Sequence, residues 1–192
     1  QIAPYQVVVV PILGKDGAAV QEHAARLAAR LGERVRVKLD DREQYTPGWK
    51  FNEWEMRGVP VRLEIGPRDI ARRQVVLARR TGGEKEAVSE DGLIDTMERI
   101  LGEVQATLLD RARRFLEEHI VDAQSVDEIA ALIEDRRGFV RVGWCEGQTC
   151  EDTIRERTGA SPRVTPLDDQ PQGTCIVCGQ PSKATVYYAR AY

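Results

Sequence analysis

The sequence has no long hydrophobic run, only two histidines and no glycine-rich phosphate-binding motif. No segment approaches the ~18 consecutive apolar residues that a membrane-spanning helix needs, so we expect no membrane partner. The first residues lack the basic region and apolar core of a secretory signal, which favours a cytoplasmic location. An initiating Met is absent too, and we therefore expect a part of a longer polypeptide.

These absences also limit the chemistry that we expect of the chain. His23 and His119 stand alone at helical or helix-end positions, and Gly82-Gly83 indicates only a turn. A phosphate-binding loop would need a glycine-rich motif that joins a strand to a helix. We therefore expect no catalytic residue and no ATP site in this chain.

Charge, in contrast, is abundant and unevenly distributed around a net value of −3. Residues 34–80 contain 12 Lys and Arg against 7 Asp and Glu, whereas the rest of the chain has 16 against 24. A basic segment inside an acidic protein is typical of a local nucleic-acid-binding surface. A solvated surface rich in salt bridges explains the same charges, so composition leaves both interpretations open.

Strand and helix patterns alternate along the first part of the chain. Continuous β-branched runs predict buried strands, alternating apolar residues predict half-exposed strands, and apolar residues three or four apart predict helices. The expected strands cover 5–12, 34–39, 59–65, 74–78 and 84–88. The expected helices cover 20–31 and 47–57, and a third, long helix begins after Ser89 and extends to Phe115. This alternation predicts an α/β domain over residues 1–120, with a mixed sheet flanked by helices.

The remaining residues, 121–192, are expected to form a small second domain. Ser125 and Glu128 match a capping box, which predicts a helix over 127–134. From Phe139 onwards the sequence is rich in Gly, Pro, Cys and short strands, with little apolar content of its own. A segment of this kind is too small to build a sufficient core, so we expect an α+β domain stapled by a metal.

Four cysteines supply the ligands for that metal. Cys145 and Cys150 have four residues between them, and Cys175 and Cys178 have two. Two short-spaced pairs joined by a long loop are the pattern of a tetrahedral structural zinc site, which has no open position for catalysis. Two disulfides, or a redox pair at Cys175 and Cys178, remain alternatives, although neither a secretory signal nor a strand-to-helix context supports them.

Residues 40–69 hold the highest density of side chains suited to RNA recognition. Proteins read unpaired bases by stacking on aromatic or guanidinium groups and by bonding to the base edges. A guanine requires an acceptor for its N1–H and N2–H₂ groups and a donor for O6 or N7. Glu55, near the end of a helix, and Arg62, on the next strand, could form that pair.

The same residues also fit a purely structural interpretation. Phe51 and Trp54 lie three residues apart on one helix, as core aromatics often do. Glu55 and Arg62 could form a surface ion pair, which contributes little free energy. The arginines at 72, 73, 79 and 80 could serve solvation alone. Residue types by themselves therefore leave nucleic-acid binding open.

Longer motifs, however, resemble a known family. The run Ala3–Ile12 resembles the first strand of class II aminoacyl-tRNA synthetase anticodon-binding domains, and residues 48–55, 58–62 and 66–69 look like their central signature. Related domains occur in histidyl-, threonyl-, glycyl- and prolyl-specific enzymes. The four-cysteine tail that ends in Tyr192 is similar to prolyl-tRNA synthetases of the archaeal/eukaryotic type.

This resemblance implies a specific function. The first domain would bind the anticodon of a proline tRNA, whose second and third bases are guanine. The whole enzyme, expected to be a homodimer, activates proline with ATP and transfers it to the tRNA, but its catalytic domain is absent here. Tyr192 would lie towards that catalytic domain. The residues that we expect to bind tRNA are Asp40, Lys50, Glu55, Arg62, Arg68, Arg72 and Arg73.

Three other interpretations stay open at this point. The chain could be the anticodon-binding part of another class II synthetase, or a free-standing RNA-binding adaptor that contains zinc. It could also be a zinc-containing protein-interaction module, in which case it would show no salt-dependent tRNA binding.

Overall fold

A computed structural model describes residues 3–14, 17–135, 138–168, 171 and 173–191. The contacts divide the chain into two compact units, Gln1–Asp110 and Arg111–Tyr192. The dividing point lies inside helix α4 (Leu93–Glu118), whereas the sequence analysis placed the domain boundary after residue 120. That domain boundary stays a prediction.

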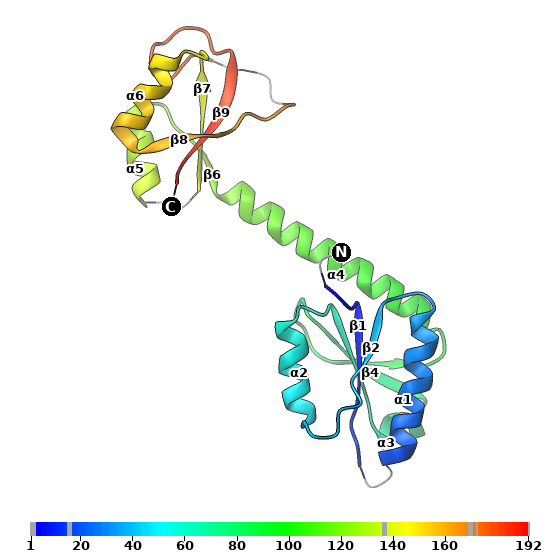
Figure 1. Cartoon of the computed structure of the whole chain (residues 1–192). Helices are drawn as coiled ribbons and strands as arrows, with labels where there is room; N and C mark the ends of the chain where they lie inside the picture. Colours follow the sequence, from blue (N-terminus) through cyan, green and yellow to red (C-terminus); the bar gives the residue numbers. More distant parts are fainter. Residues whose placement is uncertain (1–2, 15–16, 136–137, 169–170, 172, 192) are drawn as a thin grey trace. The chain divides into compact units, whose positions relative to one another are not determined.

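The first unit contains, within its described residues, a five-stranded mixed sheet in the order β2-β1-β3-β4-β5 (Figure 1). β2 and β3 both run parallel to β1, β4 is antiparallel to β3, and β5 is antiparallel to β4. The strands are β1 (Val7–Pro11), β2 (Val37–Leu39), β3 (Val61–Ile65), β4 (Gln74–Arg79) and β5 (Glu86–Ser89). The expected mixed α/β sheet is thus confirmed.

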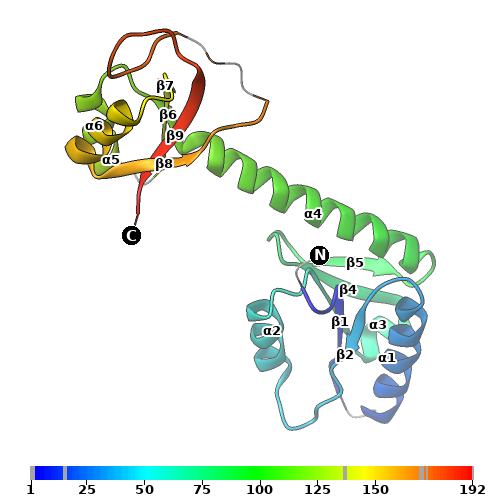
Figure 2. The same cartoon turned by 45° about the horizontal axis from the view of Figure 1, so that its top comes forward.

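Helices cover both faces of this sheet. In Figures 1 and 2, α1 (Gly17–Gly32) and α2 (Pro47–Met56) lie on opposite sides of β1. Val7 and Val9 of β1 belong to a core built with α1 and α4, while Val8 and Val10 pack with residues of α2. Because both faces of β1 are covered, its four valines are fully buried, which explains why this strand is a continuous apolar run.

The start of α2 follows from its local sequence. The Thr46 hydroxyl oxygen accepts a hydrogen bond from the Trp49 amide at 3.4 Å, and Pro47 occupies the first helical turn. Both features favour a helix that begins at this point, as the sequence predicted.

The short helix α3 (Pro67–Ala71) is not among the helices that the sequence predicts. Its first turn is stabilised by Asp69, whose carboxylate accepts a hydrogen bond from the Gly66 amide at 3.0 Å. A helix of five residues is too short to show helical periodicity, so the sequence pattern could not reveal it.

Strand β3 places polar side chains on the face of the sheet that α2 occupies. Val61, Leu63 and Ile65 are buried in the core with α1 and α4. Because side chains alternate along a strand, Arg62 and Glu64 lie on the opposite face. On that face α2 packs on β1, the neighbour of β3, so Arg62 and Glu64 lie beside the helix.

The second unit contains, in its described part, a four-stranded sheet in the order β6-β7-β9-β8. β6 is parallel to β7, and β9 runs antiparallel to both β7 and β8. The elements are β6 (Ile120–Asp122), α5 (Val126–Asp135), β7 (Phe139–Trp144), α6 (Gln148–Thr158), β8 (Ala160–Val164) and β9 (Ala184–Arg190). The small α+β domain that we expected is confirmed.

This second unit has a hydrophobic core, to which residues before Phe139 contribute together with the cysteine-containing segment. Its buried residues come from α5, α6 and three strands, and they include Ile129, Val140, Ile154, Val186 and Tyr188. Each element contributes only one to three apolar side chains, so no single window of the sequence looks apolar. For the same reason, α6 was not predicted: Ile154 is its one fully buried aliphatic residue in the described structure.

The last strand, β9, is docked between β7 and β8 rather than frayed. Tyr192, to which the sequence analysis gave a possible role near a catalytic domain, lies outside the described residues. Among the helices that the structure describes, none is long and apolar enough to cross a membrane.

Candidate functional site

Asp40 connects helix α2 to the end of strand β2. Its carboxylate accepts hydrogen bonds from Arg42 Nε at 2.8 Å and from Trp54 Nε1 at 2.7 Å, and its backbone oxygen accepts from Lys50 Nζ at 3.0 Å. Burial raises the pKa of Asp40, but the bonds from Arg42 and Trp54 outweigh it and lower that pKa to about 2. Asp40 and Lys50 are both buried, so these two predicted tRNA-binding residues lie inside the unit, where they position α2.

Arg42 extends this network to the surface. Its Nη2 group donates to Asp40 at 2.7 Å and also to Glu53, which accepts a second bond from Arg57 at 2.6 Å. The hydrogen bond from Arg42 lowers the pKa of Glu53. Arg42 is therefore held between two carboxylates at the start of α2.

Two aromatic rings that the sequence analysis did not select stack beside Arg42. The ring centroids of Tyr45 and Trp49 are 3.8 Å apart, with an angle of 10° between the planes. The Arg42 guanidinium carbon lies 5.0 Å from the Tyr45 centroid and 5.4 Å from that of Trp49. The sequence signal that could have identified this pair is the spacing of four residues between Tyr45 and Trp49. Periodicity within the helix does not reveal it, because Tyr45 precedes the helix and Trp49 lies inside it.

A second cationic group lies on the sheet face beside α2. The Arg62 guanidinium carbon is 4.0 Å from the centroid of Phe51, and Lys85 Nζ is 5.0 Å from the same centroid. Glu64, which is buried, accepts from Arg62 Nε at 3.0 Å and from Lys85 Nζ at 2.8 Å. The core interpretation is thus right for Trp54, which is buried, and partly right for Phe51, which packs against the same cluster but is half-buried and contacts two cationic side chains.

Glu55 is exposed near the end of α2. Among the described residues, no hydrogen bond or ion pair joins it to Arg62, since Arg62 pairs with Glu64. The surface ion pair between Glu55 and Arg62, one of the two interpretations from the sequence, is therefore not formed. Arg62 keeps its orientation through Glu64 and Phe51.

The other arginines that we selected lie on or next to α3 and are exposed. Arg68 is in the helix, and Arg72 and Arg73 follow it. Arg73 forms an ion pair of 2.9 Å with Asp91, and both side chains are largely exposed to solvent. Arg79, by contrast, forms ion pairs with Glu86 and Glu103 on the α4 side of the sheet. For Arg79, this agrees with the interpretation of the charges as a solvated surface of salt bridges.

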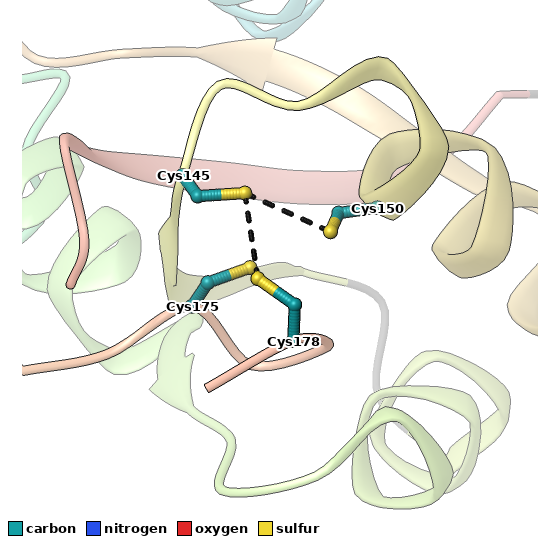
Figure 3. A group of neighbouring side chains, drawn as sticks. All are labelled: Cys145, Cys150, Cys175 and Cys178. Atoms are coloured by element: carbon teal, nitrogen blue, oxygen red, sulfur yellow. Dashed lines mark hydrogen bonds between the residues drawn. The ribbon is translucent and has the colours of Figure 1, made fainter. Parts of the chain in front are cut away.

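The four cysteines gather in the second unit, with their sulfur atoms directed at one point (Figure 3). The Sγ atom of Cys145 lies 3.6 Å from that of Cys150 and 3.7 Å from that of Cys178, and all four sulfurs lie within 4.8 Å of one another. A disulfide would need about 2 Å. Zn–S bonds of about 2.3 Å in a tetrahedron place sulfurs about 3.8 Å apart, so this donor set fits zinc.

Two turns deliver these ligands. Cys145 follows β7 and Cys150 lies in the first turn of α6, while Cys175 and Cys178 share a turn closed by the Gly179 amide, which donates to the Cys175 oxygen at 2.9 Å. Burial raises the pKa of Cys150, to about 12, and neighbouring thiols add to the effect. Burial acts in the same direction on Cys175, but backbone hydrogen bonds outweigh it and lower the pKa to about 6.

Comparison with known proteins adds to this geometry. Residues 6–100 match the family model "Anticodon binding domain", and residues 126–192 match the model "Prolyl-tRNA synthetase, C-terminal". The chain is 46% identical over 195 residues to a proline--tRNA ligase of Natranaerobius thermophilus and 44% identical over 193 residues to one of Alkaliphilus oremlandii. A proline--tRNA ligase of Clostridium botulinum (strain Loch Maree / Type A3) is 41% identical over 194 residues. In each case the match covers 100% of this chain but only 40% of the relative.

Proposed function

The chain belongs to the prolyl-tRNA synthetase family, as a counterpart of its C-terminal portion, and we propose that it recognises the anticodon of a proline tRNA. The observation that carries this proposal is that a carboxylate and an oriented guanidinium are both associated with α2: Glu55 lies near its end, and Arg62 contacts Phe51, four residues earlier on the same helix. Glu55 offers an exposed carboxylate, and Arg62 offers a guanidinium that Phe51 and the buried Glu64 hold in place. A guanine base needs one acceptor and one donor of this kind.

In this proposal, Glu55 accepts from the N1–H and N2–H₂ groups of an anticodon guanine. Arg62 donates through its terminal nitrogens to O6 or N7 of the same guanine or its neighbour, because its Nε is engaged by Glu64. Phe51 and the Arg62 guanidinium supply flat surfaces on which a base can stack. Lys85, bonded to Glu64, adds positive charge to the same surface.

The remaining predicted residues have other roles in the same proposal. Arg68, Arg72 and Arg73 contact phosphates, since all three are exposed and the pair of Arg73 with Asp91 is a weak surface ion pair. Asp40 and Lys50 act indirectly, because they are buried and fix the position of α2, on which Glu55 lies.

Zinc has a structural role in this proposal. Cys145, Cys150, Cys175 and Cys178 would hold one ion with four sulfur ligands, and such a site contributes folding free energy and supplies no chemistry. The redox alternative is less consistent with the geometry, since all four sulfurs converge and not only those of Cys175 and Cys178.

The activity of the whole enzyme is also part of the proposal, because the chain spans only 40% of the proline--tRNA ligases that it resembles. We propose that the full-length protein joins proline to its tRNA with ATP, as a cytoplasmic homodimer whose catalytic domain contacts this portion. The 192-residue chain alone should then bind tRNA but show no proline activation.

The test is to measure the affinity of the chain for an RNA stem-loop with a proline anticodon and for matched stem-loops in which each guanine is replaced by inosine, which lacks N2–H₂. Wild type should prefer guanine, and Glu55→Gln should reduce that preference at one anticodon position by about tenfold, a value typical of a lost base-edge contact. Glu22→Gln removes the same charge from α1, on the other face of the sheet, and should leave the preference unchanged. Intact guanine preference in Glu55→Gln would show that Glu55 does not read the base.

A further inference from the structure

The segment between β2 and α2 presents a flat aromatic surface to solvent. The rings of Tyr45 and Trp49 stack face to face, at 3.8 Å and 10°, and their residues keep 36% and 44% of their surface exposed. Most large hydrophobic side chains of this unit are buried in its cores. Neither ring belongs to the hydrophobic cores of this unit, and each keeps over a third of its surface in solvent, so core packing does not account for the pair.

The aromatic pair is held rigidly. Trp49 lies in the first turn of α2, where its amide donates to the capping hydroxyl of Thr46. Arg42, next to both rings, is fixed by hydrogen bonds to Asp40 and Glu53. A ligand that binds to these rings therefore orders few side chains on binding, which lowers the entropic cost of the contact.

The location of the pair also favours a ligand site. β1, β2 and β3 are parallel, so the segments that follow β2 and β3 leave the sheet at the same edge. α1 follows β1 on one face of the sheet and α2 follows β2 on the other. In α/β sheets, ligands bind outside the carboxyl ends of the strands, and Tyr45 and Trp49 lie in and just after the connection that leaves the carboxyl end of β2.

The ring faces of the pair, and not the charge next to them, select the class of ligand, because residues 40–53 contain two basic side chains against four acidic ones. Tyr45 and Trp49 lie inside residues 34–80, which carry 12 Lys and Arg against 7 Asp and Glu. Trp49 and Glu55 are six residues apart on the same helix, which is a rise of about 9 Å along its axis and a turn of about 120° around it, so an RNA loop that contacts Glu55 has to curve around α2 to reach Trp49. Every nucleobase has a flat π-face that stacks on aromatic rings, whatever its edge.

We propose that Tyr45 and Trp49 form a stacking site for an unpaired nucleobase of the bound tRNA, separate from the bases that Glu55 and Arg62 contact. This inference rests on the proposed function. The site tolerates any base, because the contact is to a ring face and not to donors and acceptors at a base edge. It therefore raises affinity without adding anticodon specificity.

The test compares four forms of the 192-residue chain, wild type, Trp49→Leu, Trp49→Phe and Leu109→Ala, in binding to the proline anticodon stem-loop and to a stem-loop with both guanines replaced. Trp49→Leu should weaken binding to both RNAs by about tenfold, with the guanine preference unchanged. Trp49→Phe keeps an aromatic face and should restore most of the affinity. Leu109 on α4 is the control because its exposed fraction, 45%, is nearly that of Trp49, 44%. Its substitution should have no effect on RNA binding.

A second readout locates the base. Stem-loops with 2-aminopurine at single loop positions should show one position whose fluorescence wild type quenches and Trp49→Leu does not. Equal affinity of Trp49→Leu and wild type, or quenching that is the same in both at every position, would overturn the inference while leaving guanine recognition standing. Failure of wild type to bind either stem-loop would overturn the proposed function and this inference together.

Discussion

Asp40 joins the end of β2 to helix α2 through hydrogen bonds of its side chain and its backbone. It is buried at the end of β2, and its partners Lys50 and Trp54 both belong to α2. A buried carboxylate is tolerated when several donors bond to it, as they do here. These donors stabilise the charged form of the Asp40 carboxylate, and its pKa is therefore lowered.

Replacing Asp40 by Asn should lower the free energy of unfolding by about 2 kcal/mol at pH 7, since a pKa lowered from 3.8 to about 2 corresponds to that energy. The folded-state pKa lies below the ordinary value, so wild type keeps this stabilisation above about pH 4 and loses it as the pH falls towards 2. Urea unfolding at several pH values measures the difference. Asp41→Asn, at the exposed neighbour, is the control. A stability gap that stays constant down to pH 2 would contradict this explanation.

Single residues differed in how well the sequence identified their roles. The cysteines were identifiable because ligand spacing is a property of the chain itself, and the structure brings all four together. Asp40 and Lys50 were selected by residue type, which carries no information on burial. Trp49 was missed because exposure of a ring depends on what the fold packs against it.

The turn between β7 and α6 has little space around its two cysteines. Glu146 has a φ of 64°, a left-handed conformation that costs a residue with a Cβ about 1–2 kcal/mol. A Cβ atom added at Gly147 would lie 3.2 Å from the Cys145 sulfur and 4.0 Å from the Cys150 sulfur. Backbone strain and close approach therefore coincide in the segment that carries half of the ligand set.

Gly147→Ala should weaken zinc binding by about tenfold, the lower end of what changes around a metal's ligands cost. The added methyl group pushes on the Cys145 sulfur, which the metal would otherwise hold in place. Competition with a chelating dye measures the affinity. Gly102→Ala is the matched control, because a Cβ added there meets nothing within 4 Å. Equal zinc affinity of Gly147→Ala and wild type would show that the turn can adjust freely.

Elements with a clear apolar pattern were predicted, including the short strands β2 and β5, whereas α3, β6 and α6 were not. β1 and α1 were correct, because a buried strand and an amphipathic helix of 16 residues have clear periodicity. α3, with five residues, and β6, with three, are short, and no alternating pattern extends beyond them as it does over residues 34–39 around β2. α6 is mostly polar, and it is held in place by Ile154 and by the turn before it more than by an apolar stripe.

The two units each have a separate hydrophobic core. The first unit combines the core beneath α1 and α4 with the smaller cluster beneath α2, and the second packs α5 and α6 on its sheet. The four cysteines lie entirely in the second unit. Metal should therefore affect the stability of residues 111–192 directly.

Removal of metal by a chelator should speed hydrogen exchange most in the cysteine turns, residues 145–150 and 175–178. The second unit has its own core, so α5 and the centre of β9 should remain partly protected. Strands β1 and β3 of the first unit serve as the internal control, and their exchange should not change. Identical exchange in the cysteine turns with and without chelator would contradict a structural role for zinc.

The central claim is that this chain reads a proline anticodon, and the most direct test is equilibrium binding to two stem-loops that differ in one base. One carries guanine at the second anticodon position and the other carries adenine. A single mismatched contact at a base edge typically changes affinity by tenfold or more, so the guanine stem-loop should bind at least about tenfold tighter, and binding of both should weaken as salt is raised. Equal affinity for the two stem-loops, or binding that does not depend on salt, would contradict the claim.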